Sequence, residues 1–292
     1  AAAAHDGFLY LGTNQGLFYR RINTDDKFKF VEGTQGQVWF LEVLDDELFC
    51  GHHTGTLKID QNKINRIASI QGTWQIRQLE DNKWLQGNYD GLYVMTNYEN
   101  QWNVSKIEGF DNSARHFEFQ NQKIFVNHEY KGVFILDVDA NFSKVENATV
   151  IKELKGANSS ISKSQDKILY ASTHGIYAYN QELKLFQKQN QFNSLFEGNQ
   201  YQSGRIIPDS EDLGFWMFSK NSINRLQWDD AEILTIPIPN DLRKEVVEYE
   251  NLISLNDEKY LVGTSEGYLI IQTNNLTLPD FEVAIDNINL GI

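Results

Sequence analysis

The amino-acid sequence predicts an all-β fold, a seven-bladed β-propeller of four-stranded antiparallel blades. The main observation is an internal repeat: a short β-prone run, a small residue, three polar residues, a second small residue and another apolar run recur seven times. Successive repeats lie 36 to 47 residues apart, with a mean of about 42, the length of one four-stranded blade. The second small residues of the seven repeats are Gly16, Gly55, Gly91, Gly132, Gly175, Ser222 and Gly267.

Each repeat is also expected to supply a first strand ahead of the motif and a more variable fourth strand after it. First strands are predicted at residues 38–44, 74–80, 115–120, 159–164, 204–209 and 251–256. The clearest fourth strands are predicted at residues 28–33, 64–70 and 104–110. Since six first strands accompany seven motifs, we expect the chain to enter blade one at its second strand. Ala1 to Ala4 are set aside because they are unlike natural sequence.

Backbone conformation and packing explain why two positions of the motif hold small residues. The second glycine can adopt the positive φ of a tight hairpin, and the first allows neighbouring sheets to approach closely. Asn127, Ala171 and Phe218 stand at the first position in three repeats, where we expect the turn chemistry to differ. Outside the repeats, the segment 240–250 has apolar and charged spacing that could form a short helix.

Composition and charge exclude several kinds of partner and site. The chain carries 26 Lys and Arg against 40 Asp and Glu, a formal net charge of −14. Without a basic face, we expect no binding of nucleic acid and no membrane contact by this segment. The single Cys50 excludes an internal disulfide framework and a thiolate zinc site. No cofactor is expected, and no apolar run approaches the length of a membrane span.

The repeat resembles a known family. Residues 11–19, 84–93 and 261–269 best match the pattern [LIV]-W-[IVL]-G-T-x-x-G-[LI]-x-x-[YF] of two-component regulator propeller repeats. Tryptophan stands at the strand position of the pattern in two repeats, and other aromatic residues that can fill the same space stand there in the rest. In chain order these residues are Tyr10, Phe49, Trp84, Phe125, Tyr170, Trp216 and Tyr260.

The C-terminal residues are similar to a second part of the same family. The run from Phe281 to Leu290 resembles the first strand of the triple-tyrosine immunoglobulin-like domain that follows such propellers. We therefore expect a propeller at residues 5–278. Residues 279–292 are expected to begin the following immunoglobulin-like domain or to close the ring of blades.

The resemblance implies a function. Family members form the periplasmic sensor of hybrid two-component regulators of Bacteroidetes, which are anchored in the inner membrane and respond to polysaccharide breakdown products. A full sensor usually has two such propellers, and this chain would be the second. The implied partners are an oligosaccharide or other small ligand, the adjacent propeller and immunoglobulin-like domain of the parent chain, and possibly a second copy of the protein.

Aromatic and polar side chains gather in the hairpins and connections that open on one end of a propeller. Sugars present apolar C–H faces and a rim of hydroxyls, which aromatic rings and polar groups recognise together. The candidate ligand-binding residues are Tyr89, Asp90, Arg115, His128, Tyr130, His174, Tyr201 and Arg205. Trp39 and Trp74 belong to the same pattern but could instead pack between blades. The histidines lack a metal-binding spacing, so no metal site is expected.

No catalytic motif is recognisable. The sequence lacks a Gly-x-Ser-x-Gly elbow, a phosphate-binding loop and a His-Glu-x-x-His motif, so this segment is not expected to be an enzyme. The alternatives to a periplasmic sensor are a protein-interaction or dimerisation propeller, and the same module in a cytoplasmic helix-turn-helix regulator. A propeller glycosidase or lyase, with two carboxylates facing each other across the mouth, ranks last.

Overall fold

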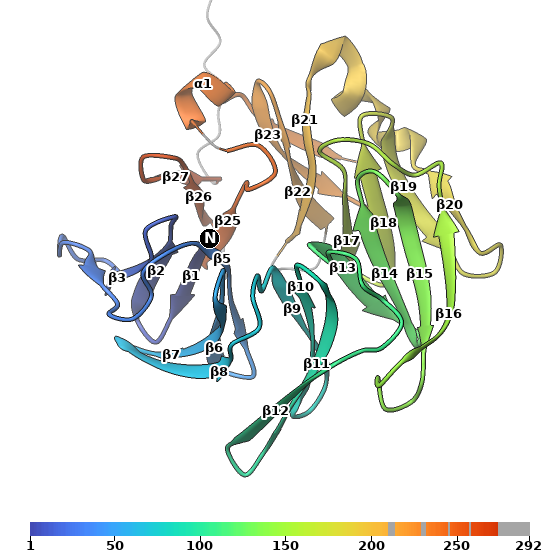
Figure 1. Ribbon diagram of the computed structural model, residues 1–292. Helices are drawn as coiled ribbons and strands as arrows, with labels where there is room; N and C mark the ends of the chain where they lie inside the picture. Colours follow the sequence, from blue (N-terminus) through green and yellow to red (C-terminus); the bar gives the residue numbers. More distant parts are fainter. Residues whose placement is uncertain (210–213, 229–231, 245, 257, 274–292) are drawn as a thin grey trace, which may run out of the picture.

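The fold is a ring of seven antiparallel sheets around a central channel (Figure 1). A computed structural model of the chain describes residues 1–209, 214–228, 232–244, 246–256 and 258–273. Six sheets have four strands, and the seventh has three among the described residues. The predicted fold class, a seven-bladed β-propeller, is confirmed. The expected boundary at residues 279–292 lies outside the described residues. Within the described ranges, no helix is long and apolar enough to span a membrane.

The first four blades are consecutive meanders in which the strands run from the channel outward. Blade one contains β1 (Ala2–His5), β2 (Phe8–Gly12), β3 (Leu17–Arg21) and β4 (Lys29–Phe30). Blade two contains β5 (Val38–Leu44), β6 (Glu47–His52), β7 (Gly55–Asp60) and β8 (Lys63–Ala68). Blade three contains β9 (Gln75–Glu80), β10 (Lys83–Asn88), β11 (Gly91–Tyr98) and β12 (Gln101–Lys106). Blade four contains β13 (His116–Gln120), β14 (Lys123–His128), β15 (Gly132–Val138) and β16 (Val145–Ile151).

The last three blades follow the same order. Blade five contains β17 (Ser160–Ser164), β18 (Lys167–Ser172), β19 (Gly175–Asn180) and β20 (Leu185–Lys188). Blade six contains β21 (Tyr201–Pro208), β22 (Gly214–Ser219), β23 (Ser222–Gln227) and β24 (Ile233–Ile236). Blade seven contains β25 (Leu252–Asn256), β26 (Lys259–Gly263) and β27 (Tyr268–Gln272). All six predicted first strands overlap these inner strands, and the prediction at 38–44 coincides with β5.

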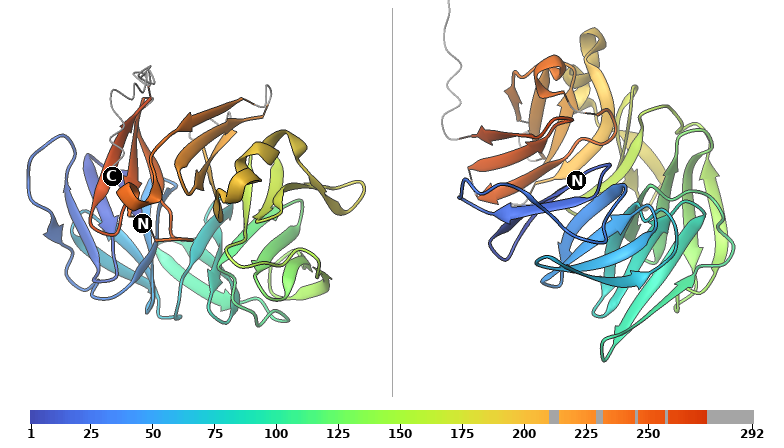
Figure 2. Two further views of the ribbon diagram at one scale, coloured as in Figure 1. Left: turned by 90° about the horizontal axis from the view of Figure 1, so that it is seen from above. Right: turned by 60° about the vertical axis from the view of Figure 1, so that its left-hand side comes forward.

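The chain enters blade one at its inner strand, so the expectation that it enters at the second strand is wrong. The segment Ala2–His5 forms β1, which pairs antiparallel with β2 and places Ala2 opposite Leu11. Ala2 is buried beside Leu261 of blade seven. Alanine favours helices and is depleted in strands, so packing rather than local propensity makes this segment a strand. Figure 2 shows blade one beside blade seven, which closes the ring.

Each seam between adjacent blades holds one hydrophobic cluster of described residues. Between blades two and three, Phe49 packs on Trp84 with ring centroids 5.8 Å apart. Between blades six and seven, Trp216 packs on Tyr260 at 4.7 Å. All seven aromatic residues at the strand position of the repeat are 2% exposed or less, so the different ring types fill equivalent interior space.

The first small residue of the motif lies where one blade meets the chain entering the next. A Cβ on Gly87 would stand 2.1 Å from the carbonyl oxygen of Ala114, inside van der Waals contact. Where the repeat has Asn127, its amide donates to the Ser159 carbonyl at 2.9 Å. Where it has Ala171, the facing residue is Gly204, whose added Cβ would meet the Ala171 carbonyl oxygen at 2.4 Å. Where the first small residue of the motif is not glycine, a side-chain hydrogen bond at Asn127 or a facing glycine opposite Ala171 therefore accommodates the close approach.

Two helical segments interrupt the connections between blades. The expected helix at 240–250 is limited to α1 (Asn240–Arg243), because Lys244 adopts a left-handed conformation with φ of 50°. The 3₁₀ segment η1 (Asn190–Asn199) was not predicted from the sequence. Its place depends on Phe192, which is fully buried against Phe215 of blade six at 5.5 Å. Such a long-range contact leaves no local pattern in the sequence.

The seam between blades three and four provides a test of the close approach. Gly87→Ala should lower the free energy of unfolding by about 2 kcal/mol, because the new methyl group overlaps a backbone oxygen that cannot move alone. Gly156→Ala is the matched control, since its Cβ would meet nothing within 4 Å. Urea unfolding followed by tryptophan fluorescence measures both. Equal midpoints for the two variants would contradict this account of the seam.

Candidate functional site

The candidate site is the mouth of the channel at the end where the inner strands begin. In an antiparallel meander, the connections between blades and the hairpins of the repeat motif open on this same end. The residues that precede or start the inner strands are thereby brought together from different blades. Trp39 lies in β5, Trp74 and Arg115 directly precede β9 and β13, and Tyr249 lies shortly before β25.

Four aromatic rings form a continuous surface there, which we call the aromatic mouth: Trp39, Trp74, Tyr89 and Tyr249. Trp39 packs on Trp74 at 4.9 Å and on Tyr249 at 5.8 Å between ring centroids. The Trp39 Nε1–H donates to the Tyr89 hydroxyl at 3.0 Å, and the Tyr89 ring meets Trp74 edge-on. Tyr89 is 39% exposed and Tyr249 is 43% exposed. The rings are thus fixed by one another yet open to solvent.

Arg115 is held against the aromatic mouth. Its guanidinium carbon lies 4.3 Å from the Tyr249 ring centroid and 5.3 Å from that of Trp74. Its two terminal nitrogens donate to Glu248, one to Oε2 and one to the backbone carbonyl, each at 2.8 Å. Glu248 has a φ of 70°, a strained conformation for a residue other than glycine. Arginine suits this place because it stacks and forms two directed hydrogen bonds at once.

Two further carboxyl groups lie next to this ion pair. Glu129, in the hairpin between β14 and β15, shares a hydrogen bond with Glu248; burial, followed by this hydrogen bond and the Glu248 charge, raises the Glu129 pKa to about 7. Glu250 is 2% exposed, and its burial raises its pKa as well. One Glu250 oxygen accepts from the Gln202 side-chain amide at 3.4 Å.

Charged side chains continue down the channel from the mouth. Arg77 of β9 donates twice to Glu118 of β13 at 3.0 Å and once to Glu42 of β5 at 3.2 Å. Arg205 of β21 reaches the Nδ1 of His116 at 3.4 Å. Desolvation, together with the Arg77 and Arg115 charges, lowers the Arg205 pKa to about 10. Burial, then the neighbouring arginines, lowers the His116 pKa well below its usual value, which keeps this imidazole neutral.

A cavity of about 700 Å³ adjoins the mouth on the side of blades five to seven. Tyr201 lines it, stacks on Phe196 and donates its hydroxyl to the Asn158 carbonyl at 2.6 Å. Lys220 and Asp241 line the same cavity and give it one cation and one anion. Its volume lies in the range of small-molecule sites, about 300–1,000 Å³.

The eight residues proposed from the sequence do not form one site. Tyr89 and Arg115 meet at the mouth, Tyr201 lies on the adjoining cavity, and Arg205 lies in the channel. The other four lie in the hairpins between the second and third strands of blades three, four and five. The ring centroids of His128 and Tyr130 lie 6.2 Å apart. Asp90 accepts a hydrogen bond from the Tyr93 hydroxyl and forms an ion pair with Lys106. His174 is exposed. Their role in ligand binding stays a prediction.

Sequence reasoning did not single out Glu42, Arg77, Glu118, Glu129 or Glu248. A signal for the first three existed: each charge lies in an inner strand and stands opposite the residue two places before the first small residue of the motif. Glu129 and Glu248 gave no such signal because their meeting depends on the paths of two loops. Trp39 of blade two and Trp74, which leads into blade three, pack on each other at the mouth and are half-buried.

No family model matches the sequence, and no curated protein matches it. Two structures of the extracellular domain of BT4673 from B. thetaiotaomicron are similar over 92% and 95% of this chain, with TM-scores of 0.64 and 0.65 at 14% and 13% identity. BT4673 is named as a candidate one-component system in the first and as a candidate hybrid two-component system in the second. This chain spans 38% of the length of either. The AfRom2 CNH domain matches over 96% of this chain and 94% of its own, with a TM-score of 0.58 at 11% identity. At these identities the likeness shows the fold alone.

The raised pKa of Glu129 predicts a pH dependence of stability. The folded protein keeps a proton there that the unfolded chain releases between about pH 4.5 and 7, so the contribution of Glu129 to stability is largest below about pH 4.5 and is lost as the pH rises to about 7. Glu129→Gln should flatten this fall and raise the melting temperature at about pH 8 above that of the wild type. Glu153→Gln, which changes an exposed carboxylate, is the control. Identical pH profiles for the wild type and Glu129→Gln would refute the prediction.

Proposed function

We propose that this chain is the extracytoplasmic sensor propeller of a hybrid two-component regulator, and that it binds an oligosaccharide at the aromatic mouth without changing it chemically. The observation that carries the proposal is the exposed aromatic surface with an arginine and carboxyl groups at its edge. Rings take the C–H faces of a sugar, and Arg115, Glu129 and Glu248 are placed to bind its hydroxyls.

The regulator-type repeat and the likeness to the BT4673 extracellular domain support a sensor. Because this chain spans 38% of those chains, the proposal includes neighbours in the parent protein: a second propeller and an immunoglobulin-like domain outside the inner membrane, in the periplasm. The ligand would act by binding one arrangement of these domains better than another. A coupling free energy of about 1 to 3 kcal/mol would suffice to shift the output.

Binding is favoured over catalysis by the contacts of Glu248. Arg115 engages this residue through its side chain and its backbone. A group held in this way is suited to orient a ligand rather than to attack one.

A second candidate, a protein-interaction propeller, is favoured by apolar side chains near α1. Leu242 is 70% exposed and Val246 is 54% exposed, both in the connection that leads into blade seven. Exposed aliphatic residues placed together often mark a contact with another domain or another copy. A sensor that docks its neighbouring domain through this connection would satisfy both candidates.

Thermal-shift screening against plant and host oligosaccharides, followed by calorimetry on the hits, tests the proposed function. A ligand at about 100 times its Kd stabilises the folded state by about 2.7 kcal/mol, which is visible as a rise in melting temperature. Tyr89→Ala should abolish the rise, because it removes an exposed ring of the mouth. Tyr98→Ala, which changes a tyrosine that is 69% exposed on the opposite end of blade three, should keep it. A rise that both variants retain would move the binding site away from the aromatic mouth.

A further inference from the structure

In the aromatic mouth, a carboxylate of the chain itself occupies the arginine that faces the rings. Arg115 donates from Nη1 to the Glu248 Oε2 and from Nη2 to the Glu248 carbonyl, each at 2.8 Å, while its guanidinium stacks on Tyr249. The side chains of Arg115 and Glu248 are 21% and 18% exposed, so solvent reaches both. An arginine binds the carboxylate of a ligand through the same kind of charged hydrogen bond.

Two features of Glu248 make this pairing replaceable. Its backbone has a φ of 70°, so the contact with Arg115 is made in a strained conformation. Its carboxyl group also shares a hydrogen bond with Glu129, a contact that needs a proton on one of the two groups. The carboxylate of a free ligand bears no backbone strain. It can therefore compete with Glu248 for Arg115.

The channel below the mouth is positive at this point, although the chain has a net charge of −14. Burial lowers the pKa of Arg205 to about 10, and the charges of Arg77 and Arg115 follow as causes, ahead of the opposing glutamates. Burial, and then the charges of these three arginines, lower the pKa of His116 as well. A cleft with low-dielectric walls focuses such a field, so an anion that enters the mouth is attracted toward Arg115.

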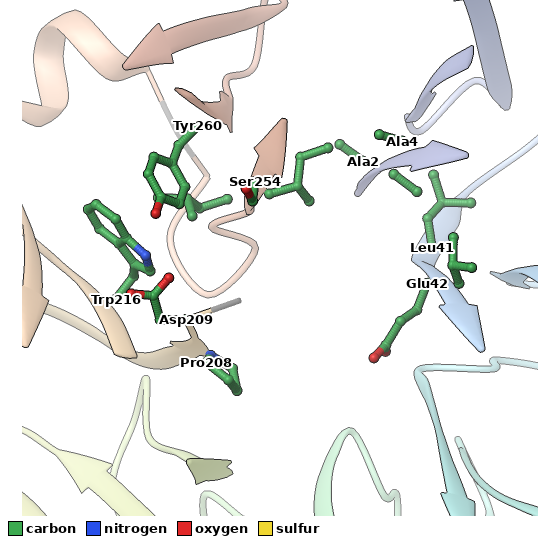
Figure 3. Close-up of a pocket in the computed structure, with 13 residues that line it drawn as sticks. Ala2, Ala4, Leu41, Glu42, Pro208, Asp209, Trp216, Ser254 and Tyr260 are labelled. Atoms are coloured by element: carbon green, nitrogen blue, oxygen red, sulfur yellow. The ribbon is translucent and has the colours of Figure 1, made fainter. Parts of the chain in front are cut away.

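The opposite end of the channel has the other charge. A cavity of about 420 Å³ lies there, and Figure 3 shows Glu42 and Asp209 on its wall. The described residues that line this cavity include no lysine, arginine or histidine. Because the inner strands begin at the mouth and end near this cavity, their length separates the two places. An anionic ligand is therefore favoured at the aromatic mouth and disfavoured at the opposite end.

We propose that the aromatic mouth selects acidic oligosaccharides, in which a uronate carboxylate takes the place of the Glu248 carboxylate on Arg115. This inference rests on the proposed function and names the class of sugar that the same site binds. The sugar ring packs on the exposed ring of Tyr89. A neutral sugar leaves Glu248 in place, whereas an acidic one releases it. The connection that leads into blade seven thereby gains a second arrangement, and a sensor responds through such a difference.

The test is calorimetric titration at neutral pH with tri-galacturonate and with its fully methyl-esterified form, which has the same backbone without the charges. The wild type should bind the acid about tenfold more tightly than the ester, because only the acid pairs with Arg115. Glu248→Gln removes the competing charge and should raise the ratio of the two affinities by about a further tenfold. Arg115→Gln should bind the two sugars equally.

Glu80→Gln is the matched control. It removes the same charge from a glutamate that is ion-paired with Lys83 at 3.0 Å, at the opposite end of blade three, and should leave both affinities unchanged. Melting temperatures check that all variants are folded. Three results would overturn the inference: equal affinity of the wild type for acid and ester, no binding of either, or the same gain in Glu80→Gln as in Glu248→Gln. In each case, a neutral hit in the oligosaccharide screen would still support the proposed function.

Discussion

The whole structure depends on face-to-face packing between adjacent blades. Each sheet is a local meander, and nothing but its two faces joins it to the rest of the ring. A blade removed from the ring would expose two apolar faces to water, so every blade is stabilised by both neighbours. The seven interior clusters meet this need, and four of them contain the large aromatic side chains from the strand position of the repeat. Blade one and blade seven meet in the same way, through Ala2, Leu9 and Leu261.

This packing also decides where polar chemistry can lie. The faces of the blades are occupied by the seams, and the inner strands leave only a narrow channel and its two ends free. At one end, loops from blades two, three, four and seven bring Trp39, Trp74, Arg115 and Tyr249 together. At the other, Trp216 and Asp209 stand on the wall of a cavity. Between them, Arg77 pairs with both Glu42 and Glu118.

The fold could be predicted from the sequence because its signals are local. Alternating apolar residues, turn residues and the spacing of the repeat located β5 to the residue and the other predicted inner strands nearly as well. The strand β1 was not predicted because alanine has no β preference. The segment η1 was not predicted because Phe192 is positioned by a contact with a residue of another blade. The site was predicted only in part for the same reason. Tyr89 and Arg115 were recognisable by type and position, whereas the pairing of Glu129 with Glu248 depends on loops that meet only when the ring has closed.

The small residue can stand on either side of a seam, and this has a consequence for how the sequence can change. Two segments approach closely at several seams, and the glycine can stand on either side: Gly87 of blade three faces the Ala114 carbonyl, and Gly204 of blade six faces the Ala171 carbonyl. At Asn127 a hydrogen bond serves instead. A small residue on one side of a seam can therefore take the place of a small residue on the other side without opening the ring. This allows the repeats within one chain to diverge in sequence. Propellers can then keep the same backbone shape at 13% identity.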